Sequence, residues 1–480
     1  MDGLTAPAET LQVDADFVDR FVCGRADEAE VRRLARQDGE VITFTLLEVQ
    51  RRMTGVAPAT GANTPSAAIP PYAKPNAQPK KGKRRRGGQK GHPGRSRKTS
   101  PDPDRVRDHY AEGCPDCGGK LRDTGESRER ITEDIPEDLK PVITKDVIHR
   151  GYCDHCRKRV EPKPPDVLPR CTLGNRTLVL SALLHFLQGL TIGQIVDTFN
   201  FHLRLKVTPG GLVQMWHRLA DILFAWYQQI HQDILDSGKL HADETSWRVA
   251  GKTHWLWCFA NDQNVYYLID RSRGSPALAK FFTRAFEGTL ITDFWSPYDA
   301  IVCADQQKCW PHLLRDVASV DEKSRGDRHW DSFCRRLVSV YRDAKKLHGV
   351  GDEMPEADYD MSIARLEGRL IKLGSEDWDH ADARRLAKRC IKYSSELLTF
   401  LWYEDVPSDN NAGERAIRPA VMIRKNSYQS GSDRGALTSS VLMSVLRTLR
   451  VRGHQPIDAI LAALADYNRT GTLPKMPPSG

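Results

Sequence analysis

Acidic side chains at three places in the chain could together support phosphoryl transfer. Asp243 lies in the run "HADET", Asp293 lies in "LITDF", and Glu414 lies in "SDNNAGERAIRP". Carboxylates that converge repel one another unless cations are bound, and a pair of Mg²⁺ ions is the usual arrangement at such sites. One ion activates the attacking oxygen and the other stabilises the leaving oxygen. For any single aspartate, a surface ion pair is the simpler explanation, so the elements that carry the acids must decide.

The elements that would position these acids begin near residue 239. Three runs rich in β-branched and aromatic residues are followed by a helical run, a fourth strand, a short helix and a fifth strand. This order predicts an α/β fold with an RNase H-like catalytic core, in which the first and fourth strands are neighbours. Asp243 and Asp293 would then meet at one edge of the sheet, whereas strand alternation turns Glu244 to the opposite face.

The rest of the second half is predicted to be helical. Residues 238–320 are predicted to form the first part of the core, residues 321–404 an all-α insertion, and residues 405–480 the last helices of the core with a C-terminal tail. Glu414 would come from a helix whose start is marked by Ser408, Asp409 and Asn410, which are typical capping residues. Pro419 predicts that this helix is short or kinked near Arg418.

Two C-x2-C pairs in the first half have the spacing of metal ligands. Cys114 and Cys117 lie in "CPDCGG", and Cys153 and Cys156 lie in "CDHC". Four thiolates of this kind predict a structural Zn²⁺ site, and the alternating segment between them predicts a zinc ribbon-like domain over residues 108–170. A redox C-x-x-C is the alternative, but no thioredoxin-like surroundings accompany it.

Basic residues are concentrated in two places. The formal net charge is +8, and residues 80–98 alone hold ten Lys and Arg without an acid. Such a block predicts double-stranded DNA as a partner through counterion release, with a solubility tail or a localisation tag as the alternative. The cations predicted to contact DNA are Lys80, Lys81, Lys83, Arg84, Arg85 and Arg86 in this block, and Arg415, Arg418, Arg424, Lys425 and Arg434 after Glu414.

The remaining segments are less specific. Residues 1–60 are predicted to be an N-terminal helical segment and residues 61–107 a basic disordered linker. Residues 171–237 are predicted to be helical and are compatible with a helix-turn-helix DNA-binding domain, although a plain α-bundle fits as well. The longest apolar run, residues 177–190, is too short and too polar to cross a membrane. No signal peptide is visible, so we expect a cytoplasmic protein that is nucleoid-associated when DNA-bound.

Four motifs together resemble a known family of enzymes. The runs "HADET", "LITDFWSPYDAI", "KCWPHLLRDV" and "VPSDNNAGERAIRPAVMIRKNSYQSGSDRG" are similar to those of the DDE transposases of the bacterial insertion sequence sixty-six family, of the transposase C type. "RRRGGQKGHPG" resembles the family's basic linker, and the cysteine pairs resemble its zinc-binding domain. The likeness covers residues 80 to 465, and "DNNAGERAIRP" is its most specific part.

The resemblance implies a function and assigns residues to it. Asp243, Asp293 and Glu414 would be the catalytic triad that holds Mg²⁺ or Mn²⁺, and Cys309 and His312 would form a supporting C-x-x-H element, with a zinc site at Cys303, Cys309 and His312 as the rival. The implied reaction is cleavage at the ends of an insertion sequence followed by transfer of the freed 3′-hydroxyl into target DNA. Small accessory proteins encoded nearby and a homo-oligomer are expected partners. The alternatives are an RNase H-like nuclease or resolvase without strand transfer, and a domesticated DNA-binding regulator.

Overall fold

The computed structural model describes residues 103–480, apart from residues 113, 123, 125, 126, 133, 137, 138 and 325. These residues belong to one structural unit, residues 70–480. The predicted N-terminal helical segment and the basic block from Lys80 to Arg86 lie outside the described residues.

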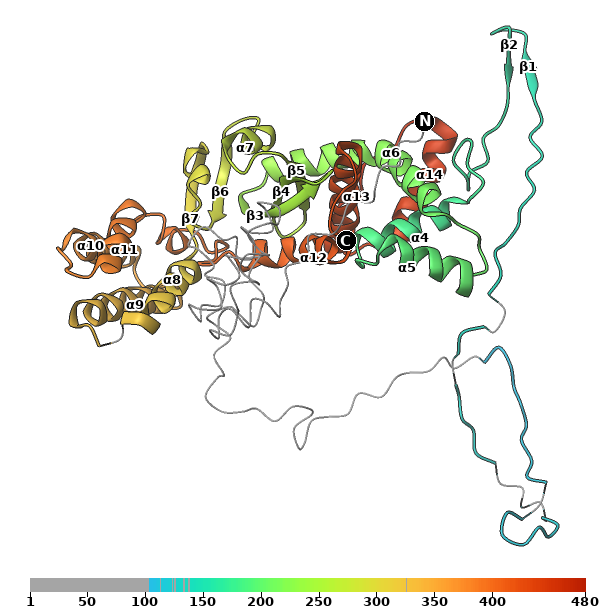
Figure 1. Cartoon of the computed structure of the whole chain (residues 1–480), viewed down its shortest axis with the longest axis horizontal. Helices are drawn as coiled ribbons and strands as arrows, with labels where there is room; N and C mark the ends of the chain where they lie inside the picture. Colours follow the sequence, from blue (N-terminus) through green and yellow to red (C-terminus); the bar gives the residue numbers. More distant parts are fainter. Residues whose placement is uncertain are drawn as a thin grey trace, which may run out of the picture. The chain divides into compact units, whose positions relative to one another are not determined.

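A five-stranded mixed sheet forms the centre of the described chain (Figure 1). Its strands and the short helices between them are β3 (Lys239–Val249), β4 (Lys252–Ala260), β5 (Val265–Asp270), α7 (Ser275–Phe281), β6 (Phe286–Thr292), η5 (Ser296–Ala300) and β7 (Cys303–Lys308). The spatial order is β5-β4-β3-β6-β7. β3, β4 and β5 pair antiparallel, while β6 runs parallel to β3 and β7 runs parallel to β6. The predicted element order is therefore present, and β3 and β6 are neighbours.

Helices from both ends of the described chain pack on one another, and some of them contact the strands of this sheet. From the N-terminal side come α4 (Asn175–Phe186), α5 (Ile192–Asp197), the π-helix η4 (Thr198–His202) and α6 (Pro209–Leu235). From the C-terminal side come α12 (Asn411–Ser427), α13 (Asp433–Val451) and α14 (Pro456–Thr470). The start of α6 is the segment compatible with a recognition helix, yet its Leu212, Trp216 and Leu219 are buried, and α6 packs on α13. That packing favours the α-bundle alternative.

Hydroxyl groups of α13 bond directly to the backbone of the edge strand β5. Ser440, Ser444 and Thr448 accept hydrogen bonds from the N–H groups of Ile269, Tyr267 and Val265, at 3.2, 2.8 and 3.0 Å. The three hydroxyls recur every four residues, along one face of the helix. They satisfy donors that an edge strand otherwise leaves to the solvent.

The other end of the sheet is followed by an all-α block. Its elements are α8 (Trp310–Ser324), α9 (Arg328–His348), η6 (Gly351–Glu353), α10 (Glu356–Ser375), α11 (Ala381–Lys392) and η7 (Thr399–Leu401). The block begins at residue 310 instead of the predicted 321, because Trp310, Leu313 and Val317 of α8 are buried in its hydrophobic core. The predicted fifth strand is β7. It ends at Lys308, since Pro311 suits the first turn of a helix and cannot donate to a strand ladder.

The cysteine-bearing segment has little regular structure. Its strands are β1 (Gly151–Cys153) and β2 (Lys158–Val160), which form a hairpin around the second C-x2-C pair. The strands expected between the two pairs are absent from the described residues of that stretch, where Val142 and Ile143 are each 92% exposed. Apolar side chains without a packing layer do not stabilise a sheet.

Within the part of the chain that the structure describes, no helix is long and apolar enough to cross a lipid bilayer.

Candidate active site

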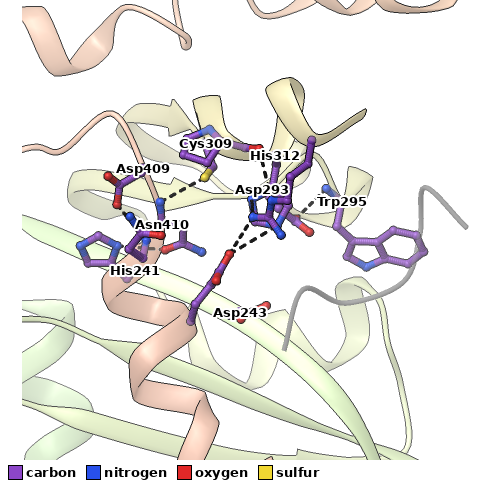
Figure 2. Close-up of polar contacts among 12 residues, drawn as sticks. His241, Asp243, Asp293, Trp295, Cys309, His312, Asp409 and Asn410 are labelled. Carbon is purple, nitrogen blue, oxygen red and sulfur yellow. Dashed lines mark hydrogen bonds and ion pairs between the residues drawn. The ribbon is translucent and has the colours of Figure 1, made fainter. Parts of the chain in front are cut away.

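Two aspartates are brought together by the pairing of β3 with β6. His241 lies opposite Ile291 in this parallel ladder, and continuing the register by two residues places Asp243 opposite Asp293, directly after the end of β6. Figure 2 shows both side chains at this end of the sheet. The Asp293 carboxylate also accepts a hydrogen bond of 2.8 Å from the backbone N–H of Trp295, which fixes the turn that follows the strand.

Glu414 reaches the same place from the first turn of α12. This helix begins at Asn411, where the Asp409 carboxylate accepts the backbone N–H at 2.9 Å. It continues through Pro419 to Ser427, so the helix is not short, and the predicted kink near Arg418 stays a prediction. Proline removes one helical hydrogen bond, and the packing of Ile417, Ala420 and Val421 against the sheet compensates for that loss.

Asn410 connects the three elements that carry the acids. Its side chain does not cap α12. Instead, the amide nitrogen donates to the backbone oxygen of Ala242 at 2.8 Å, and the amide oxygen lies 2.9 Å from Nδ1 of His241. Its backbone N–H donates to Sγ of Cys309 at 3.2 Å, and its backbone oxygen accepts from the N–H of Glu414 at 3.0 Å. Figure 2 shows this arrangement, which fixes α12 to β3 and to the start of α8.

Space around the Asn410 side chain is limited by the next turn of the helix. A Cβ atom at residue 413 would lie 2.7 Å from the Asn410 amide oxygen, closer than real contacts allow. Because the amide is held at both of its ends, it cannot move aside, and glycine at 413 is therefore required. The sequence predicts a cap at Asn410, and no signal in a single sequence distinguishes a capping asparagine from one that crosslinks to a strand.

Asp243 is the acid whose charge is least compensated. It is 4% exposed, one carboxylate oxygen accepts the backbone N–H of Glu244 at 2.9 Å, and Oδ2 is buried without a hydrogen-bond partner among the described residues. Burial raises the pKa of Asp243 well above its usual range, and the charges of Glu244, Asp293 and Glu414 raise it further. A buried, unpaired carboxylate oxygen beside other carboxylates is an environment that a bound cation would stabilise.

Glu414 has a cationic partner that sequence reasoning missed. Nη2 of Arg315, in the second turn of α8, donates to Oε1 of Glu414 at 2.7 Å. The same guanidinium nitrogen lies 3.1 Å from Nδ1 of His312. Arginine only donates, so Nδ1 must accept and the proton of the neutral ring is on Nε2. Burial, with the Arg315 charge, lowers the pKa of His312 and favours that neutral form.

Cys309 and His312, the residues of the predicted C-x-x-H element, lie in different surroundings. Cys309 is buried after the end of β7, and it binds Asn410 as described above. His312 lies in the first turn of α8, and its Nε2 is 3.9 Å from Oε1 of Glu414 and makes no hydrogen bond with a described group. Cys309 therefore holds the backbone, whereas His312 borders the acids.

Glu244 is buried on the opposite face of β3, as strand alternation predicts. It accepts hydrogen bonds from Arg273 at 3.0 Å and from the Tyr298 hydroxyl at 2.7 Å. The Arg273 guanidinium lies 4.4 Å from the ring centroid of Trp255 and 3.9 Å from that of Trp295. Burial raises the pKa of Glu244 to about 7 and the charge of Asp293 adds to the effect, while Tyr298 and Arg273 oppose it. This cluster supports the sheet beneath the acids.

The predicted DNA-binding cations after Glu414 divide into two groups. Arg415, Arg418 and Lys425 are exposed on α12 and make no hydrogen bond or ion pair with another described residue. By contrast, the Arg424 guanidinium binds Thr245 and Ser246 of β3, and burial lowers its pKa. Arg434 forms an exposed ion pair with Asp221 at 2.6 Å. The first group is available to a ligand, whereas Arg424 fixes α12 to the sheet.

Metal-binding geometry is not preformed in the described chain. No group of three or more His, Cys, Asp or Glu side chains lies at distances suited to one ion there. Each cysteine pair is nevertheless locally arranged for thiolates. Backbone hydrogen bonds, chiefly from Cys117, lower the pKa of Cys114, and those chiefly from Cys156 lower the pKa of Cys153. The four-cysteine zinc site stays a prediction.

Comparison with known proteins gives one family match and several relatives. A family model described as "Transposase IS66 family" matches residues 170–438, which include all three acids. The uncharacterized protein y4qI of Sinorhizobium fredii (strain NBRC 101917 / NGR234) is 22% identical over 375 residues, covering 72% of this chain and 68% of that protein. The uncharacterized protein y4jD of the same organism is 22% identical over 425 residues, covering 78% of this chain and 80% of the relative.

Replacement of Asn410 tests its role as the crosslink of the site. Asn410→Ala removes the bonds to His241 and Ala242 and leaves a buried carbonyl unpaired, so we expect the free energy of unfolding to fall by about 1–3 kcal/mol. Asn411→Ala is the matched control, because that residue is exposed in the same turn and should change stability by less than about 0.5 kcal/mol. Urea denaturation measures both, and equal losses would contradict the crosslink.

Proposed function

The chain belongs to the IS66 family of transposases, and on that premise we propose that it cleaves DNA at the ends of an insertion sequence and joins the freed 3′-hydroxyl to target DNA. The observation that carries this proposal is the convergence of Asp243, Asp293 and Glu414, from two neighbouring strands and one helix, at one end of a mixed sheet. The strand order and directions support an RNase H-like assignment for the core.

Divalent cations fit the carboxylates of this site. The partnerless Oδ2 of Asp243 and the repulsion among the acids favour cation binding, so Asp243, Asp293 and Glu414 would hold Mg²⁺ or Mn²⁺. When bound, such ions supply Lewis acidity at the attacking and leaving oxygens of an in-line phosphoryl transfer. The carboxyl oxygens are hard ligands that match these ions.

The protein's own residues orient the acids and the substrate. Arg315 fixes one oxygen of Glu414, and Asn410 sets the position of the helix that carries it. His312 directs an N–H at Nε2 beside Glu414, where it can donate to a phosphate oxygen of the DNA. Arg415 and Arg418 follow Glu414 on the exposed face of α12 and would bind the DNA backbone there.

A nuclease or resolvase would use the same acids without joining strands, and a DNA-binding regulator would not need them. The regulator does not explain why Asp243 is buried without a partner, because such a carboxylate costs stability and serves no binding role. Between transposase and nuclease, the family match favours the transposase. Accessory proteins and a homo-oligomer remain proposals.

A strand-transfer reaction tests the function directly. The substrate would be a labelled duplex carrying the terminal sequence of the element, with a supercoiled plasmid as target and Mg²⁺ or Mn²⁺ present. We expect joined products with the wild-type chain, and a loss on the order of 10²–10³-fold with Glu414→Gln. Glu404→Gln, the same change at an exposed residue just before α12, should leave the yield unchanged. Metal-dependent nicking without joining would replace the proposal by the nuclease.

Thermal unfolding tests the cation site without an activity readout. In EDTA, Asp243→Asn removes one charge from a group of carboxylates, and we expect the melting temperature to rise. Mg²⁺ should then raise the melting temperature of the wild-type chain more than that of the variant. Asp299→Asn is the control, because Asp299 is paired with Lys308 and Lys392 and its replacement should destabilise the protein. A destabilised Asp243→Asn would count against cation binding.

We also propose that Cys114, Cys117, Cys153 and Cys156 together bind one structural zinc ion. Elemental analysis of the purified chain should find about one zinc per molecule, and Cys114→Ser should lose it. Cys334→Ser, at a half-buried position in α9, should retain it. Zinc that persists in Cys114→Ser would exclude this ligand set.

A further inference from the structure

The turn that ends α12 has an unusual backbone conformation for a tyrosine. Tyr428 has φ 63° and ψ −51°, and the N–H of Gln429 donates to the backbone oxygen of Ser427 at 2.7 Å. These values define a classic γ-turn, which is rare and strained for any residue other than glycine. The strain requires surrounding contacts that leave the chain no other path.

Residues on both sides of Tyr428 supply those contacts. The N–H of Tyr428 donates to the backbone oxygen of Arg424 at 2.8 Å, which ends the helix. Ser430 forms a bridge to the hairpin between β3 and β4, with its N–H on the oxygen of Arg248 at 3.0 Å and its own oxygen accepting from Ala250 at 2.9 Å. The turn is thus held by the catalytic helix on one side and by the strand of Asp243 on the other.

The Tyr428 side chain points away from all of this support. It is 77% exposed, and its hydroxyl makes no hydrogen bond with another described residue. The ring also has no aromatic or cation–π partner among the described residues, so no such interaction offsets the strain of the turn. Strained positions of this kind are concentrated at ligand sites.

The surroundings of Tyr428 indicate what the ring meets. Arg415, Arg418, Met422 and Lys425 are exposed along α12 at spacings of three and four residues, and Tyr428 continues that row. We call this row the outer stripe of α12. The stripe begins beside Glu414 and holds three cations that have no partner among the described residues. A row of cations that ends at an exposed ring suits nucleic acid, whose phosphates pair with the cations and whose bases stack on the ring.

We propose that Tyr428 stacks on a DNA base several nucleotides from the reacting phosphate, while Arg418 and Lys425 bind the intervening phosphates. This inference rests on the proposed function and adds a contact to a base. Glu414 lies near the start of α12 and Tyr428 directly follows its last residue, so the two are fourteen residues apart, which is about 21 Å at 1.5 Å per residue. Along one DNA strand that distance corresponds to about six nucleotides.

Fluorescence of a base analogue tests the stacking without catalysis. The probe is a duplex with the terminal sequence of the element, in which 2-aminopurine replaces single bases at successive positions from the cleavage site. All proteins would carry Glu414→Gln, so that the DNA stays intact. We expect the fluorescence to change on binding at a position about six nucleotides from the cleavage site. The added change Tyr428→Gly should abolish this signal and weaken binding by about 5- to 100-fold.

Two comparisons separate a DNA contact from a structural role. Tyr428→Gly relieves the strained backbone, so its melting temperature should equal or exceed that of the parent, and Tyr428→Trp should keep both the signal and the affinity. Arg418→Ala should weaken binding and lower its salt dependence while the fluorescence change of the bound DNA persists.

The outcomes also separate this inference from the proposed function. If the wild-type chain joins DNA ends and Tyr428→Gly binds the probe with unchanged affinity and signal, the stacking is overturned and the transposase stands. A change in oligomeric state without a change in DNA binding would assign Tyr428 to an interface between copies and overturn the inference as well. A chain that binds no DNA would overturn both.

Discussion

Mutual repulsion among carboxylates is the constraint on which this structure depends. Asp243, Asp293 and Glu414 lie on elements far apart in sequence, and nothing in their own chemistry draws them together. Other parts of the protein hold these acids close together: the ladder between β3 and β6, the hydrogen bonds of Asn410, and Arg315. These surrounding contacts oppose the repulsion and so determine how far apart the acids lie.

The acids differ in how their charges are compensated, and that difference assigns them roles. Glu414 has a guanidinium partner, and Glu244 on the other face of β3 has a guanidinium and a phenol. Asp243 is the exception, with a buried oxygen that no described group contacts. A protein can tolerate such a group where function requires it, at the expense of stability. A neighbouring cation would therefore stabilise Asp243 more than either glutamate.

Much of the fold could be predicted from sequence because local patterns determine it. Alternation and turn residues indicate the five strands, and the position of Asp243 within a strand fixes the face that it shares with the site. Contacts between segments that are distant in sequence could not be predicted from these local patterns. Arg315 was one of many cations, Asn410 resembled a cap, and the start of the all-α block depended on which core would bury Trp310. Pro419 wrongly suggested a short helix, because tertiary packing outweighs the loss of one helical bond.

Both borders of the sheet are occupied by the chain itself. At one edge, the hydroxyls of α13 accept hydrogen bonds from backbone N–H groups of β5. At the other edge, the N–H of Lys308 in β7 donates to the backbone oxygen of Glu396 at 2.8 Å. The Thr399 hydroxyl donates to the backbone oxygen of Gln306 at 2.7 Å. Among the described residues, these bonds leave few backbone groups at either edge to pair with a second molecule. Such occupied edges disfavour growth of the sheet from one molecule to the next when the protein accumulates during expression.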